Sequence, residues 1–322
     1  MSRARAALLA SDPAVEEVAA TELAASAGSA VAAVVAGYFA AAGRHPGVLL
    51  APLSMLIGGV GQSGRVFDGR WCQPGRGARR PRGLLPGAEI PTAARIAVPT
   101  SIAALAVAIV YESGLSLAPL VRHGIAAAER AESPARAALL GRIAGVGPIA
   151  LSEPGFVQPM LRLAAASQGG MLTPTDFGAP AEVDGAAAER SDGNRRWLEP
   201  AWASEPAPPQ SELGQGHAII AVDAHGRFVA LAYRVIDTGL TVPELGVTAP
   251  IGAIPVQRGV PRIAPGRRLS SPAPLAIVRG EGSGAVEVIA EPGSVHLDLG
   301  TPSPGRLSIR RDPRSRLVSA KR

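Results

Sequence analysis

Two short stretches carry the side chains best suited to binding a carboxylate. Ser270 and Ser271 follow a Pro-Gly turn and directly precede an apolar run, in PGRRLSSPAPLAIV (265–278). Tandem hydroxyls at the mouth of a strand can donate hydrogen bonds to a carboxylate or help to hold an oxyanion. Arg70 follows VFDG at the end of another predicted strand, where its planar fork can hold a carboxylate through two hydrogen bonds. The alternative for the serines is an ordinary turn.

A β-hairpin is predicted for GQGHAIIAVDAHGRFVALAYRV (214–235). Both arms are apolar and largely alternating, and DAHG stands between them. Asp223 opens the turn, and Gly226 can adopt the positive φ that the far side of the turn needs. A hairpin of this kind is usually scaffold, so the functional question is which residue begins it.

The histidines and the single cysteine argue against a metal site. Cys72 is the only cysteine, which excludes an internal disulfide and a multi-cysteine metal site. None of the five histidines has a second ligand at the usual spacing. Residues 59–64 match G-x-G-x-x-G, but neither a capped helix nor a suitably spaced acidic residue follows, so a turn is favoured over a phosphate-binding loop. We therefore expect no metal and no cofactor.

Positive charge is concentrated in one segment of a basic chain. The net charge is +6, and Lys321 is the only lysine. A nucleic-acid surface usually interleaves its charges with aromatic side chains or aligns them on one helix face. Only Phe67 and Trp71 lie near, so a solvated loop is favoured and nucleic acid stays an alternative partner. The six arginines of residues 65–82 are Arg65, Arg70, Arg76, Arg79, Arg80 and Arg82.

The most apolar stretch, residues 24–43, predicts a buried helix rather than a membrane span. It is rich in Ala and Gly instead of Leu and Ile. The first residues offer only a short apolar run before Asp12 and make a poor signal peptide. A single cysteine is typical of a reducing compartment. Together these features predict a soluble, cytoplasmic protein with no membrane partner.

The predicted elements divide the chain into a helix-rich half, a linker and a strand-rich half. Capping and stop signals place helices at 13–42, 98–113, 115–131, 133–145 and 154–177, the last of them ending at Gly169-Gly170. Residues 54–70 form a strand, a Gly-rich turn and a strand, and 273–280 with 284–294 form a second hairpin. Residues 178–212 carry much Pro, Glu and Ala and little periodicity, which predicts a linker or exposed loop. We expect one composite α+β domain made of 1–177 and 213–322, with helices packed over sheets.

The order of these segments resembles the γ-glutamyltransferase (γ-glutamyltranspeptidase) family. AGSAVAAVVA (27–36) is similar to that family's GGNAVDAAVA, and MLIGGVGQSGRVFDGR (55–70) resembles its Gly-rich turn and DFRE stretch. HAIIAVDAHGRFVALAYRV (217–235) resembles THFSVVDADGNAVSLTYTL, and APGRRLSSPAPLAIV (264–278) resembles PGKRPLSSMSPTIV. The likeness spans roughly 7–178 and 213–316. It implies an N-terminal-nucleophile hydrolase-like αββα sandwich in shortened form.

The resemblance also implies a place for the nucleophile, and this chain departs from the family there. In the family the hairpin begins with a threonine, whose amine is freed by self-cleavage and whose hydroxyl attacks the substrate. Here Gly216 or Gln215 stands at that place, and neither supplies a nucleophile. Ser211 is the nearest upstream hydroxyl and a weak candidate for a displaced nucleophile. No catalytic residue is therefore assigned from the sequence.

Some of the residues that bind the substrate in the family have counterparts in this sequence. It implies that Arg70 pairs with the α-carboxylate of a γ-glutamyl group, with Ser270 and Ser271 beside it. The family's oxyanion-hole glycine pair becomes Gly293 and Ser294. The segment that holds the substrate amine in the family corresponds to GAIPVQRGV (252–260), which has no acidic residue.

Three functions remain open on the sequence. The first is a γ-glutamyltransferase-like protein that has lost catalysis and binds a γ-glutamyl or other carboxylate ligand, or a partner protein. The second is an active γ-glutamyl hydrolase or transferase for glutathione-type substrates, with a displaced nucleophile such as Ser211. The third is a nucleic-acid-binding protein that uses residues 65–82. The first is favoured, because the nucleophile and the amine-binding acid are missing together.

Overall fold

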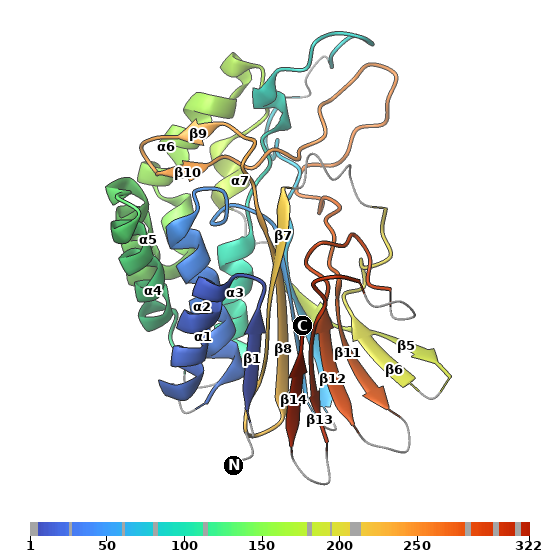
Figure 1. Cartoon of the computed structure of the whole chain (residues 1–322). Helices are drawn as coiled ribbons and strands as arrows, with labels where there is room; N and C mark the ends of the chain where they lie inside the picture. The colour runs from blue at the N-terminus through green and yellow to red at the C-terminus, as the bar shows by residue number, and fades with distance from the viewer. Residues whose placement is uncertain are drawn as a thin grey trace.

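Two antiparallel β-sheets face each other, and a layer of helices covers the free face of one of them (Figure 1). The computed structural model describes residues 6–25, 28–59, 62–79, 83–111, 115–178, 182–193, 195–206, 214–280, 285–298, 303–312 and 317–322. Among them the order is helices, first sheet, second sheet. Helices cover the first sheet only, so the second helical layer of the expected αββα sandwich is missing from this part of the chain.

The first sheet has the strand order β1-β7-β8-β2-β3-β4 and combines strands from both halves of the sequence. The predicted hairpin forms its centre, with Val222 opposite Phe228 at the turn. The Asp223 carboxylate accepts hydrogen bonds from the backbone N–H groups of His225 and Arg227, and Gly226 has φ +85°. The strands are β1 (Ala7–Ala10), β2 (Leu53–Gly59), β3 (Gln62–Gly69), β4 (Asp184–Ala186), β7 (Gln215–Val222) and β8 (Arg227–Val235).

The second sheet has the strand order β14-β13-β12-β11-β6-β5. The expected second hairpin is its β11–β12 pair, whose connecting residues 281–284 lie outside the described chain. A separate two-stranded ribbon consists of β9 (Thr241–Val242) and β10 (Val247–Thr248). The strands of the second sheet are β5 (Ala188–Asp192), β6 (Arg195–Glu199), β11 (Leu275–Gly280), β12 (Val286–Ala290), β13 (Leu307–Arg311) and β14 (Val318–Lys321).

The central strands of the first sheet are buried on both faces. Ala218 and Ile220 point between the sheets, whereas Ile219 and Ala221 point into the helical layer. A strand with two buried faces needs apolar residues at successive positions, which explains the nearly continuous apolar run of the hairpin. The space between the sheets is filled from the other side by Ile277, Val288 and other β-branched and aliphatic residues.

The apolar stretch around residues 24–43 is a buried helix, as the sequence predicts. Ser29 caps α2 (Ala30–Arg44) by accepting a hydrogen bond from the N–H of Ala32, and residues 30–43 are buried. In the part of the chain that is described, no helix has the length and hydropathy needed to cross a membrane. The other helices are α1 (Pro13–Ala25), α3 (Ser101–Tyr111), α4 (Leu117–Arg130), α5 (Pro134–Val146), α6 (Pro154–Ala164) and α7 (Pro174–Gly178), with short 3₁₀ turns η1 (Thr92–Arg95), η2 (Gly147–Ser152) and η3 (Ala166–Gln168).

Two segments differ from the sequence-based expectation. The predicted linker 178–212 contributes β4 to the first sheet and β5 and β6 to the second, so much of it is built into the sandwich. Residues 154–177 form α6, η3 and α7 rather than one helix. Helix α6 ends at Ala164, with Ala165 as its C-cap, and Gly169, in the left-handed conformation, ends the η3 turn that follows, at the Gly169-Gly170 stop signal.

Candidate functional site

The strand directions bring the predicted site residues to one end of the sandwich. In the first sheet Gly216 pairs with Arg234, and Tyr233 pairs with Leu53, which in turn pairs with Gly69. Arg70 therefore lies at the same sheet edge as the first residues of β7. In the second sheet the predicted serines immediately precede β11, and the predicted oxyanion glycine follows β12. Antiparallel pairing of these strands places both segments at that end.

Gly216 has no room for a side chain. A Cβ atom added there would lie 1.8 Å from the carbonyl oxygen of Pro292 and 3.3 Å from Nη1 of Arg234. A threonine or serine at this place would collide with the backbone. The nearest group is moreover a carbonyl oxygen, which repels a developing oxyanion, whereas an oxyanion hole needs N–H donors. This end of the hairpin cannot perform nucleophilic acyl transfer from position 216.

The space beside Gly216 is closed, and a buried arginine fills it. The cavity lined by Gly216, His217, Arg234 and Pro292 has a volume of only about 10 Å³. Arg234 is 7% exposed and donates a hydrogen bond to the carbonyl of Gly214 at 3.3 Å. Within the described residues its guanidinium has no carboxylate partner. Burial accordingly lowers the pKa of Arg234 to about 10.

His217, the next residue of β7, points to the opposite face of the sheet. Its ring stacks on Tyr233 with 5.4 Å between the centroids, and its Nδ1 shares a 3.2 Å hydrogen bond with the hydroxyl of Ser11. Burial lowers the pKa of His217, and the charges of His45 and Arg234 act in the same direction, while Asp12 and Asp237 oppose them. His217 therefore joins β7 to the start of α1 and does not face the space between the sheets.

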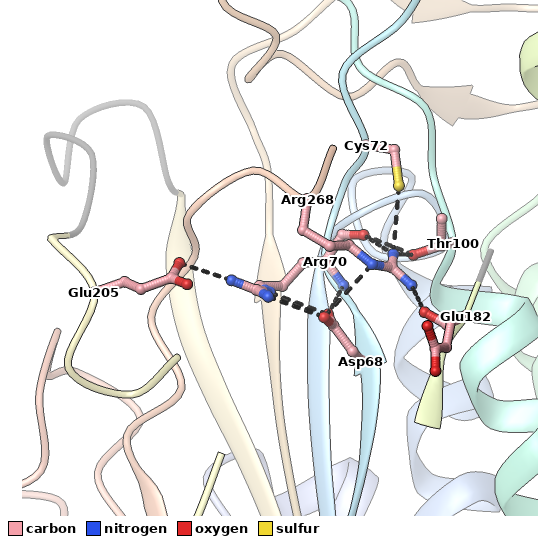
Figure 2. A network of polar contacts seen from close by, with 7 residues as sticks. All are labelled: Asp68, Arg70, Cys72, Thr100, Glu182, Glu205 and Arg268. Atoms are coloured by element: carbon pink, nitrogen blue, oxygen red, sulfur yellow. Dashed lines mark hydrogen bonds and ion pairs between the residues drawn. The ribbon is translucent and has the colours of Figure 1, made fainter. Parts of the chain in front are cut away.

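Arg70 is buried, and carboxylates of the chain itself already hold it (Figure 2). Its Nε and Nη2 donate to the carboxylate of Asp68 at 3.0–3.2 Å, and its Nη1 donates to Oε2 of Glu205 at 2.9 Å. Arg268 lies on the other side of Asp68, with its Nε 3.5 Å from Oδ2. Arg70, the residue expected to bind a carboxylate, therefore already binds the carboxylates of Asp68 and Glu205.

Arg268 fixes the loop that carries Arg70. Its Nη1 donates to the carbonyl of Arg70 at 2.7 Å and to the hydroxyl of Thr100 at 2.6 Å, and lies 3.5 Å from the thiol of Cys72. Its Nη2 donates to the carbonyl of Glu182 at 2.6 Å. These contacts hold the end of β3, the start of α3 and the segment before β4 together, as Figure 2 shows.

The turn that follows β6 covers Arg70 and one of the predicted serines. The ring of Trp202 lies 4.2 Å from the Arg70 guanidinium, in cation–π contact. The hydroxyl of Ser270 donates to the carbonyl of Pro206 at 2.5 Å. Glu205 itself is exposed, with half of its side-chain surface open to solvent, whereas that of Arg70 is 7% open. The covering segment, residues 200–206, therefore rests on the predicted carboxylate site from its solvent side.

The remaining predicted site residues are placed as follows. Ser271 is buried, and Gln215 is exposed. A Cβ at Gly293 would meet nothing within 4 Å, so position 293 has room for a side chain, whereas position 216 has none. Ser211, the candidate displaced nucleophile, lies outside the described residues.

The Arg-rich stretch is less solvated than predicted. Arg65 forms an ion pair with Asp184, and Arg70 is buried. Arg79 is exposed, while Arg80 and Arg82 are not among the described residues. Binding of nucleic acid to this stretch stays a prediction.

The sequence analysis missed the residues that complete the Arg70 network. Asp68, near the end of β3, stands two residues before Arg70, a spacing that lets its carboxylate reach the guanidinium, and Arg268 lies just before the tandem serines. Asp68 belongs to the same VFDG stretch as the end of the predicted strand, and Arg268 belongs to the same PGRRLSS stretch as the serines. Glu205 had no such signal, because 135 residues separate it from Arg70.

Comparisons with known proteins support the fold. No protein-family model matches this sequence, and no curated protein matches it. Among solved structures, LmbA2991T421A has a TM-score of 0.75 at 14% identity, and LmbA2991HD a TM-score of 0.73 at 13%, each over 100% of this chain and 97% of the other. Cephalosporin acylase from Bacillus halodurans has a TM-score of 0.56 at 13% identity, over 88% of this chain and 76% of that one. The chain thus shares its fold, at low sequence identity, with these three solved structures, one of which is an acylase.

Proposed function

We propose that this chain is a γ-glutamyltransferase-like protein that has lost catalysis and keeps a binding site for small carboxylates around Arg70. The observation that carries the proposal is the carbonyl oxygen of Pro292, which occupies the place where a side chain of residue 216 would project. Glycine at position 216 has no hydroxyl group that could attack a substrate. It also has no hydroxyl group that could attack the preceding peptide bond, so we expect no self-cleavage before the hairpin.

The carboxylate site is supported by the chemistry of Arg70 and Glu205. A buried guanidinium needs anionic partners, and Asp68 uses one edge of the fork. The second partner, Glu205, is half exposed, and an exposed carboxylate is held by only about 1 kcal/mol or less. A ligand carboxylate can therefore replace Glu205 on Nη1 at small cost. In this proposal Glu205 acts as an internal substitute for the ligand.

The proposal predicts that the purified chain stays intact. Overnight incubation at neutral pH followed by intact-mass measurement should give a single full-length mass. Two fragments that join between residues 205 and 217 would overturn the loss of catalysis and would favour a displaced nucleophile such as Ser211. The new N-terminus would then identify the nucleophile, and turnover of a γ-glutamyl anilide would test the activity.

Ligand binding provides a second prediction. Calorimetric titration with L-glutamate should detect weak binding to the wild type, and Glu205→Gln should bind roughly five-fold more tightly, because the competing carboxylate is gone. Arg70→Lys keeps the positive charge and loses the fork, so its affinity should fall about tenfold or more. Arg70→Ala is the poorer test, because it would leave the carboxylate of Asp68 buried with only Arg268 nearby.

Glu189→Gln is the matched control for Glu205→Gln. Glu189 is equally exposed and is also paired with an arginine, Arg196, but it lies on β5 away from Arg70. Its replacement should leave glutamate affinity unchanged. If neither the wild type nor Glu205→Gln binds glutamate while both remain folded by circular dichroism, the γ-glutamyl part of the proposal is wrong.

A further inference from the structure

A second hollow of ligand size lies on the helical side of the first sheet and adjoins the site above at Cys72 and Thr100, which Arg268 contacts. Its volume is about 490 Å³, within the range of roughly 300–1,000 Å³ that is usual for small-molecule pockets. Its walls come from α3, η2 and α7, and from the loop that follows β3. Neither Arg70 nor Ser270 lines it.

Helix α3 explains why this hollow is apolar. The sequence SIAALAVAIVY has no charged residue, and its two faces are both hydrophobic. One face, with Ile102 and Leu105, packs into the core, while Ala103, Val107 and Val110 line the hollow at helical spacing. A helix that is apolar all round is normally buried all round. Val110 is nevertheless 79% exposed, and Ile149 of η2, which also lines the hollow, is 64% exposed.

Part of the lining of the hollow is polar and includes an available positive charge. Cys72, Thr100 and Arg76 contribute to this polar part. The guanidinium of Arg76 lies against Gly266, and the residues that the structure describes offer it neither a hydrogen bond nor an ion pair. Asp176 also lines the hollow, but its carboxylate accepts hydrogen bonds from the backbone N–H groups of Gly75, Arg76 and Thr173. That carboxylate holds the loop and leaves the Arg76 side chain free.

We propose that this hollow binds a small molecule with an apolar body and one carboxylate, the carboxylate pairing with Arg76 and the body lying along α3. The second apolar face of α3 then has a partner, and the guanidinium gains the charge-assisted hydrogen bonds that it lacks. A single guanidinium balances a single negative charge. The fork geometry of arginine favours a planar carboxylate as the group that carries this charge.

Three probes that separate charge from chain length test the proposal. Decanoate has both parts, decanol has the chain without the charge, and acetate has the charge without the chain. Calorimetry at probe concentrations below micelle formation should show decanoate binding most tightly, decanol roughly tenfold more weakly, and acetate not at all. Decanoate should also slow the alkylation of Cys72, measured by intact mass, because Cys72 is the only cysteine and lines the hollow.

Two variants and a control assign the binding to this hollow. Arg76→Gln should weaken decanoate about tenfold and leave decanol unchanged, and Val107→Trp should weaken both by filling the space beside α3. Arg79→Gln is the control, because Arg79 is exposed on the same loop and does not line the hollow. Circular dichroism shows whether each variant is folded. The absence of decanoate binding to the wild type, equal affinity in Arg76→Gln, or decanol binding as tightly as decanoate overturns the proposal.

The outcome is independent of the function proposed for Arg70. Glu205→Gln should not change decanoate affinity, and glutamate should not compete with decanoate. If glutamate fails to bind while decanoate binds in an Arg76-dependent manner, only the Arg70 proposal falls. Competition between the two ligands would show that the hollow is not a separate site.

Discussion

Arg70 and Arg234 are buried at the same end of the sandwich, and their surroundings differ in a way that matters for function. Arg70 has Asp68 and Glu205 as partners and a tryptophan ring on its face. Among the described residues Arg234 donates to one carbonyl, that of Gly214, and burial lowers its pKa to about 10. Arg234 thus lies beside the place where the resemblance implies a reacting hydroxyl. Arg70, which the resemblance implies as the partner of a substrate carboxylate, is already paired within the chain.

The closed space at Gly216 leads to a prediction for stability at the residue scale. Gly216→Ala should destabilise the fold by at least about 2 kcal/mol, because its Cβ would overlap the carbonyl oxygen of Pro292 and the two sheets would have to move apart. Gly293→Ala is the matched control, since a Cβ there meets nothing within 4 Å, and it should change stability by no more than about 0.5 kcal/mol. Urea denaturation measures both. Equal stability of the two variants would contradict the closed site.

At the scale of elements, β7 is tied to the N-terminal segment through Ser11. The N–H of Ser11 donates to the carbonyl of Ala218 at 3.0 Å, and the N–H of Ala218 donates to the hydroxyl of Ser11 at 3.1 Å. The imidazole of His217 shares its hydrogen bond with the same hydroxyl. The junction between β1 and α1 therefore holds the first residues of the hairpin in place.

This junction should make stability depend on pH. Burial holds the pKa of His217 below its usual value of 6.5, so below pH 6.5 the unfolded chain binds a proton that the folded chain does not. The free energy of unfolding should therefore fall as the pH drops from about 6.5 toward the folded pKa, by up to about 1.4 kcal/mol per pH unit. His217→Gln should remove this part of the pH dependence. Urea titrations at pH 7.0, 6.0 and 5.5 measure it.

His225→Gln is the control for that measurement. His225 is exposed at the hairpin turn, where its backbone N–H donates to the Asp223 carboxylate. Its replacement should keep the wild-type pH dependence. An unchanged slope in His217→Gln would show that His217 takes up its proton equally in both states.

On the scale of the whole molecule, the two halves of the sequence form one structure. The first sheet places β1 and β2 beside β7 and β8, so neither half can complete its core alone. The last residue, Arg322, forms an ion pair with Glu16 of α1. On the outer face of the second sheet, Trp197, Val278 and Ile289 are buried together, with Leu297 packed against them. In the described chain, side chains and a loop therefore close the face that a second helical layer would cover.

Local signals in the sequence were sufficient for most of the elements. Asp223 and Gly226 predict the hairpin turn, Ser29 caps α2, and Gly169 ends η3, because each acts through the backbone of its own neighbours. The strands β4, β5 and β6 were not predicted. Their short, polar sequences gain order from pairing with distant strands, which composition does not show.

The sequence by itself determined that residues 215 and 216 carry no nucleophile and that Arg70 and two serines stand at strand ends. Only the tertiary structure decided what these residues can do. The carbonyl oxygen of Pro292 leaves no room for a side chain at position 216, and Glu205 forms an ion pair with Arg70. The apolar hollow along α3 needs η2 and α7 as its other walls. Each of these contacts joins segments that are far apart in the chain. Their presence depends on how the layers pack, and no local pattern of residue types encodes it.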